Sequence, residues 1–235
     1  MAHIFVIAGH GAGDPGASGN GYTEAERVRA LAAKIKAYGG GDVTVGDIGR
    51  NWYADNGISS LNISKDWQII ELHMDGASSA SARGGHVIIN STFSPDKYDT
   101  ALAAFISGVL PGRAQTIVKR SDLANPKRAA AKGYPYRLLE CGFITNAEDV
   151  KIFNSQMDNI AKGILAAFGI NASGAGAVST PTTPAKPSSG TTAKSVLTVD
   201  GKWGRNTTLR LQQIFGTVQD GVVSFQRAAY RQAGC

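Results

Sequence analysis

The sequence has only two cysteines in 235 residues, Cys141 and Cys235, which is too few for a disulfide-stapled scaffold. It has no uninterrupted apolar run of the roughly 18–20 residues that a membrane-spanning helix needs, so membrane insertion is not expected. The amino terminus lacks a basic start followed by an apolar segment and a small-residue cleavage site. We therefore expect no signal peptide, and a protein made in a cytoplasm that acts elsewhere only after something else releases it.

Most of the chain also lacks an excess of charge of either sign. Residues 1–170 carry 17 Lys and Arg against 16 Asp and Glu, whereas residues 171–235 carry 7 against 2. The basic excess therefore lies in the tail, where it favours binding to an anionic polymer, for example one in a bacterial envelope. Aromatic residues are too sparse among the tail's basic residues to indicate a nucleic-acid surface.

Short β-branched runs alternate with helical patterns over residues 1–170, which predicts an α/β domain. The expected strands are Ile4–Ala8, Val43–Val45, Trp67–His73, His86–Asn90, Thr116–Lys119 and Arg137–Phe143. The expected helices are Glu24–Tyr38, Lys97–Val109 and Ala147–Phe168.

The composition changes abruptly after this domain. Residues 171–194 consist mostly of Ala, Gly, Ser, Thr and Pro, without apolar periodicity, and predict an extended linker. Residues 195–235 regain apolar positions and contain a near-repeat, VDG and QDGV, but about 40 residues is very small for an independent fold. We interpret them as a small separate module, either truncated or dependent on a partner copy.

Two of the four histidines fit a ligand site. His10 and His73 each lie at the carboxyl end of a predicted buried strand and have small neighbours, and the carboxyl ends of parallel strands are where ligands gather. His3 is expected on the surface and His86 in a structural position.

Helix geometry selects the acid that would join these histidines. Glu24 falls on the same helical face as Val28, Leu31 and Ile35, which predicts that it points inward. Glu26 points away and fits a capping box with Thr23. Two neutral imidazoles and one carboxylate, with a water in the fourth position, form a catalytic zinc arrangement. We therefore predict one zinc ion held by His10, Glu24 and His73.

A further carboxylate, Glu140, ends an apolar run, where a buried charge is costly unless it is used. It is interpreted as the general base that takes a proton from zinc-bound water and returns it to the leaving amine. The alternative is a salt bridge, for example to Arg137. Glu71 flanks His73 as an outer partner or a plain structural acid, and the role of Asp75 stays open.

Three motifs carry a resemblance to a known family: GHGAGDPGASGNGYTEAE, ELHMDGAS and LLECGFITNAED. In this order they resemble the zinc-dependent N-acetylmuramoyl-L-alanine amidases of the amidase-3 family, including those of phage endolysins. The resemblance implies a mostly parallel six-stranded sheet flanked by helices, with His10, Glu24 and His73 on zinc and Glu140 as the catalytic acid. Where the family usually has an Asn after the second histidine, this chain has Asp75.

The resemblance also implies a function. It predicts cleavage of the amide that joins N-acetylmuramic acid to L-alanine in peptidoglycan, for lysis of a host cell. The tail resembles the small wall-binding repeats of phage endolysins, which would bind a cell-wall polymer. Two alternatives remain: a zinc endopeptidase or carboxypeptidase acting on peptidoglycan peptides, and a non-catalytic wall-binding protein.

Overall fold

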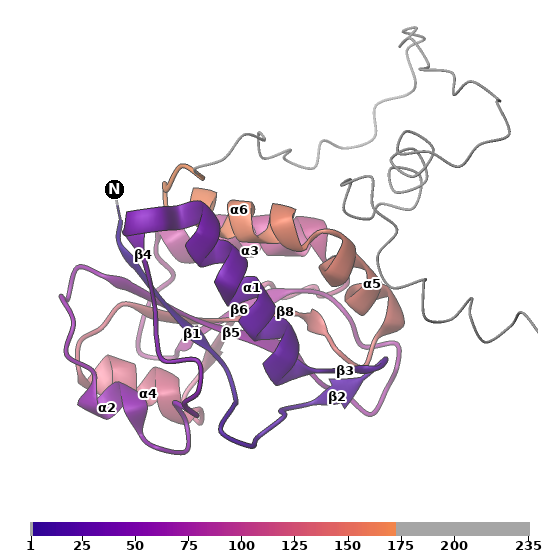
Figure 1. Ribbon diagram of the computed structural model, residues 1–235, viewed down its shortest axis with the longest axis horizontal. Coiled ribbons are helices and arrows are strands. Elements are labelled where there is room, and N and C mark those ends of the chain that lie inside the picture. The colour runs from indigo at the N-terminus through magenta and orange to yellow at the C-terminus, as the bar shows by residue number, and fades with distance from the viewer. Residues whose placement is uncertain (1, 173–235) are drawn as a thin grey trace, which may run out of the picture. The chain divides into compact units, whose positions relative to one another are not determined.

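A central six-stranded sheet organises residues 2–172, the part of the chain that the computed structural model describes (Figure 1). The order across the sheet is β4 (Val43–Val45), β1 (Ile4–Ala8), β5 (Gln68–Asp75), β8 (Tyr136–Phe143), β6 (His86–Asn90) and β7 (Ile117–Arg120). Strands β4, β1, β5 and β8 are parallel, and β6 and β7 are parallel to each other but antiparallel to β8. The mostly parallel six-stranded sheet predicted from the sequence is thereby confirmed.

Helices cover both faces of this sheet (Figure 1). One face packs against α1 (Glu24–Gly39), α3 (Lys97–Val109), α5 (Ala147–Ser155) and α6 (Met157–Ala167), and their apolar residues form the larger core cluster. The other face packs against α2 (Gly57–Ser60) and α4 (Ala124–Ala131) through a smaller cluster that includes Ile58 and Ala129. The strands are apolar on both faces because both faces are covered.

The expected final helix, Ala147–Phe168, is wrong as a single element. The structure ends α5 at Ser155 and begins α6 at Met157, and Gln156 between them has φ −114° and ψ 16°. Both helices place their apolar residues, such as Phe153 and Ile160, in the same core cluster. The apolar periodicity therefore continues across the break, so the sequence pattern does not indicate that the helix is interrupted.

Several short elements were not expected. A two-stranded hairpin, β2 (Ser18–Gly19) with β3 (Tyr22–Thr23), precedes α1, and a 3-10 turn (Gly40–Asp42) follows it. Helix α2 has four residues, and α4 (ANPKRAAA) begins after Leu123 without a side-chain cap. Neither helix is long enough or periodic enough to produce a helical signal.

The strand that carries His73 is longer than predicted. Strand β5 continues to Asp75, and its register against β8 shifts between His73 and Asp75. His73 therefore lies within the strand, two residues before its end, and not at the last position.

No helix in residues 2–172 is long and apolar enough to cross a membrane. The predicted module at 195–235, and all but the first two residues of the predicted linker, lie outside the described residues.

Candidate metal centre

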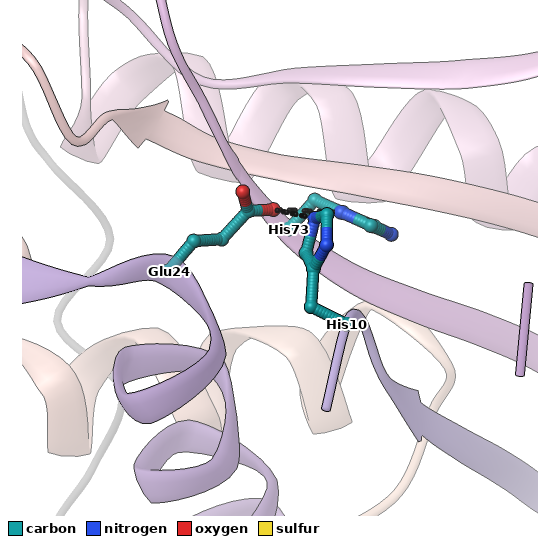
Figure 2. A group of neighbouring side chains, drawn as sticks. All are labelled: His10, Glu24 and His73. Atoms are coloured by element: carbon teal, nitrogen blue, oxygen red, sulfur yellow. Dashed lines mark hydrogen bonds and ion pairs between the residues drawn. The ribbon is translucent and has the colours of Figure 1, made fainter. Parts of the chain in front are cut away.

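Three predicted ligands converge at the carboxyl end of the parallel strands. His10 lies just after β1, His73 lies near the end of β5, and Glu24 is the first residue of α1 (Figure 2). Glu24 Oε1 is 2.7 Å from His73 Nδ1 and 3.1 Å from His10 Nε2. One donor atom from each residue lies within 4.8 Å of the other two. Two imidazole nitrogens and a carboxylate oxygen at this spacing form a group that could hold a metal ion.

The local sequence explains why the three side chains meet. His10 has φ 60°, in the left-handed region that a non-glycine residue rarely adopts, which turns the chain sharply after β1. Thr23 then caps α1 by accepting a hydrogen bond from Glu26 N at 3.3 Å, and this starts the helix at Glu24. The predicted capping role is confirmed for Thr23, whereas the Glu26 carboxylate pairs with Arg27.

Glu24 is fixed from several sides. It is 4% exposed, Ala17 N donates to its Oε2 at 3.0 Å, and Met74 N donates to its Oε1 at 3.1 Å. Burial alone raises the pKa of Glu24, but the hydrogen bonds with His10 and His73 outweigh burial and bring this pKa to about 2. Glu24 is therefore charged at neutral pH, as a metal-binding carboxylate has to be.

Each imidazole has a carboxylate on the nitrogen that faces away from Glu24. His10 Nδ1 lies 2.9 Å from Asp14, and His73 Nε2 lies 3.0 Å from Glu71. Hydrogen bonds with Glu24 and Asp14 raise the pKa of His10. Burial lowers the pKa of His73, but its hydrogen bonds with Glu24 and Glu71 raise that pKa well above its usual value. The site thus favours positive charge at both rings.

Glu140 stands beside this cluster. It is the register partner of His73 across the β5–β8 pair, so the two side chains lie on the same face of the sheet. Its Oε2 is buried and has no hydrogen-bond partner among residues 2–172. Burial raises the pKa of Glu140 to about 8, with nearby Glu24 and Asp75 adding to the effect and His73 opposing it. A half-buried carboxyl group with one buried, unpaired oxygen, next to metal-type donors, is a candidate for proton transfer.

The alternative that Glu140 pairs with Arg137 is wrong. Arg137 Nε binds Asp99 at 2.7 Å and Arg137 Nη2 binds Asp96 at 3.0 Å. Residues three apart on a strand point to opposite faces, so Arg137 turns toward α3 and Glu140 toward the opposite face.

Other polar residues also have assigned positions. His3 is partly exposed, in agreement with the expected surface position, and it stacks on Trp67 and hydrogen-bonds Thr44. His86 is buried at the start of β6 and lies outside the ligand cluster, in agreement with a structural role.

The sequence did not predict the contacts of Asp14 and Asn51 at this site. Neither residue belongs to a recognisable pattern, and each reaches the site only because the loops fold as they do. Asp75 pairs with Arg113 at 3.6 Å.

Two glycines leave the space that the ligand side chains occupy. A Cβ atom added at Gly9 would lie 2.4 Å from the His73 ring, and one added at Gly16 would lie 2.7 Å from both His10 and Glu24. The absence of a side chain at these two positions is therefore a requirement of the ligand cluster.

Gly9→Ala is expected to destabilise the metal-free protein by about 1–3 kcal/mol, because the ring of His73 must shift to admit the new methyl group. Denaturant unfolding measures this change. Gly41→Ala is the matched control, since a Cβ there meets nothing within 4 Å. Equal stability of the two variants would show that the His73 ring is not confined as described.

Comparison with known proteins places these features in a family context. Residues 4–169 match the Amidase_3 family, described as N-acetylmuramoyl-L-alanine amidase. Probable autolysin PH of Staphylococcus aureus (strain NCTC 8325 / PS 47) is 33% identical over 192 residues, which cover 70% of this chain and 38% of the relative. The chain thus spans well under half of that relative's length.

Solved structures share the fold. The catalytic domain of CwlV from Bacillus (Paenibacillus) polymyxa has a TM-score of 0.53 at 18% identity, over 72% of this chain and 96% of that domain. The catalytic domain of the CD27L endolysin, which targets Clostridia difficile, has a TM-score of 0.57 at 19% identity, over 73% of this chain and 99% of that domain. At such identities the likeness concerns the fold.

Proposed function

This chain belongs to the Amidase_3 family of N-acetylmuramoyl-L-alanine amidases, and on that premise we propose that it is a zinc-dependent peptidoglycan amidase. The bond cleaved is the amide between the lactyl group of N-acetylmuramic acid and L-alanine of the stem peptide. The observation that carries the proposal is the convergence of His10, Glu24 and His73 on one point, with Glu140 beside them.

The residues present fit a zinc ion. His10 Nε2, His73 Nδ1 and a Glu24 oxygen would hold it, and the glycine cradle around these side chains leaves them room. When bound, zinc supplies Lewis-acid polarisation of the scissile carbonyl and acidifies water. Hard cations such as Mg²⁺ prefer oxygen ligands, so a donor set with two nitrogens favours zinc.

The chain's own part in the chemistry falls to Glu140. Its carboxylate accepts a proton from the water that attacks the lactyl carbonyl carbon, and a new C–O bond forms. The C–N bond then breaks, and Glu140 passes the proton to the departing alanine nitrogen. The products are a lactyl carboxylate and a free amino terminus. A cation bound beside Glu140 would lower the Glu140 pKa from about 8, which favours the carboxylate form that accepts this proton.

Digestion of purified peptidoglycan tests the proposal. We expect intact glycan strands and peptides that begin with L-alanine, identified by mass spectrometry. A chelator should reduce product release to background, and added zinc should restore it, because the proposed reaction needs the ion to polarise the scissile carbonyl and acidify the water. Peptides cut within the stem would instead indicate a zinc peptidase. Wall binding without any product after zinc addition would indicate a non-catalytic protein.

The proposal extends to a biological role. We propose that the protein is a phage-type endolysin that is made in a host cytoplasm, reaches the wall after release and lyses the cell. Residues 195–235 would bind a cell-wall polymer, and residues 171–194 would link that module to the catalytic domain at 1–170. The support is sequence-based: a Pro, Thr and Ser-rich segment followed by a basic tail.

A further inference from the structure

Glu71 is a charged side chain buried behind the candidate metal centre. It is 3% exposed, and it shares the face of β5 with His73, one alternation further into the sheet. A buried carboxylate is costly unless its oxygens are hydrogen-bonded. Hydrogen bonds to both Glu71 oxygens offset that cost.

Both oxygens of Glu71 are occupied. Oε1 lies 3.0 Å from His73 Nε2, and Oε2 accepts a hydrogen bond from Tyr136 Oη at 2.6 Å. Asn125 Nδ2 lies 3.1 Å from Oε1 and 3.0 Å from Oε2. Tyr136 and Asn125 come from β8 and α4, so two other elements fix this carboxylate and leave Oε1 facing the imidazole.

Two residues of this network have further support: Asn125, which hydrogen-bonds Glu71, and Asp14, the carboxylate next to His10. Arg128 Nη1 donates to Asn125 Oδ1 and to the Tyr53 carbonyl, both at 2.9 Å. Two residues before Tyr53, Asn51 Nδ2 donates to Asp14 at 3.1 Å. The supports on the two sides of the site therefore meet in one short segment, Asn51 to Tyr53.

We propose that Glu71 is a positioning residue that fixes His73 as an Nδ1 ligand by accepting the Nε2 proton. A carboxylate on the outer nitrogen sets the tautomer and orientation of a ligating imidazole and increases its basicity. His10 takes the opposite arrangement, with Nδ1 toward Asp14 and Nε2 toward Glu24. The two histidines thus use different nitrogens, and each choice is imposed by a neighbouring acid. This inference rests on the proposed zinc site.

Zinc affinity of the full-length chain, measured by competition with a chelating indicator, tests the role of Glu71. Glu71→Ala should weaken zinc binding by about 10–100-fold, and Glu71→Gln by less, because an amide oxygen still accepts the Nε2 proton. Tyr136→Phe keeps the Glu71–His73 contact and should give the smallest change. Nitrogen-15 NMR of the zinc-loaded protein should show His73 protonated at Nε2 in the wild type, and this preference should be lost in Glu71→Ala.

Asp99→Asn is the matched control. Asp99 is also a buried carboxylate with several hydrogen bonds, but it binds Arg137 on the other face of the sheet. It should lower stability without changing zinc affinity. If the wild type binds one zinc and the Glu71 variants bind it equally well, or if Asp99→Asn weakens binding as much, the positioning role is wrong while the proposed function stands. A wild type that binds no zinc would overturn both.

Discussion

Glu140→Gln should lower kcat for peptidoglycan hydrolysis by about 10²–10⁴-fold while one zinc remains bound per chain. The amide has nearly the shape of the carboxyl group but cannot accept the proton of the attacking water. Because Glu140 lies beside the ligands and is not one of the three, the metal content should be unchanged. Release of new amino termini measures activity, and elemental analysis measures zinc. Retained turnover in the zinc-loaded variant would remove Glu140 from the reaction.

The same substitution has a second, independent signature in the metal-free protein. The folded-state pKa of Glu140 is about 8, above the ordinary value of 4.5, so folding favours its protonated form. Below pH 4.5 both states hold the proton and the group has no effect. As pH rises from 4.5 to 8 the unfolded chain gains by releasing the proton, and the wild type loses stability that the Gln variant keeps. The difference should approach a few kcal/mol in denaturant unfolding.

The sequence predicted the sheet well because its strands are short apolar runs bounded by polar and glycine-rich segments. The bounds of β1 and β6 agree with the expectation to the residue. It could not predict α4, because Ala129 is the only residue of this helix that belongs to the buried part of the smaller apolar cluster. It also missed the break at Gln156. Both outcomes depend on tertiary packing, which apolar periodicity does not encode.

The convergence of His10, Glu24 and His73 was predictable for a different reason. Glu24 could be separated from Glu26 by helix geometry alone, and the structure buries Glu24 in the cluster while Glu26 pairs with Arg27. The outer partners were not predictable. Asn51 and Asn125 lie far from the ligands in sequence, and their contacts exist only because α4 and the segment before α2 fold against the smaller face of the sheet.

His73→Ala should abolish zinc binding and, with it, hydrolase activity. In the proposed site His73 supplies one of the three ligand atoms of the chain. Its loss also removes the imidazole that lies between the carboxylates of Glu24 and Glu71, so the two negative charges are no longer separated by it. Two remaining ligands are too few for a catalytic zinc site. Zinc that binds only the folded state at 1,000 times its dissociation constant adds about 4 kcal/mol to stability. The wild type should therefore show a large zinc-dependent rise in Tm, and His73→Ala none.

His86→Ala separates loss of a ligand from loss of a buried histidine. His86 lies on the same face of the sheet and opposite Glu140 on β6, yet it is outside the ligand cluster. Burial lowers the pKa of His86 to about 4, so the ring is neutral at neutral pH and its removal takes no charge from the site. His86→Ala should lose stability with and without zinc but keep the zinc-dependent rise in Tm. If it loses that rise and His73→Ala keeps it, the ion is held at a different place from the point where His10, Glu24 and His73 meet.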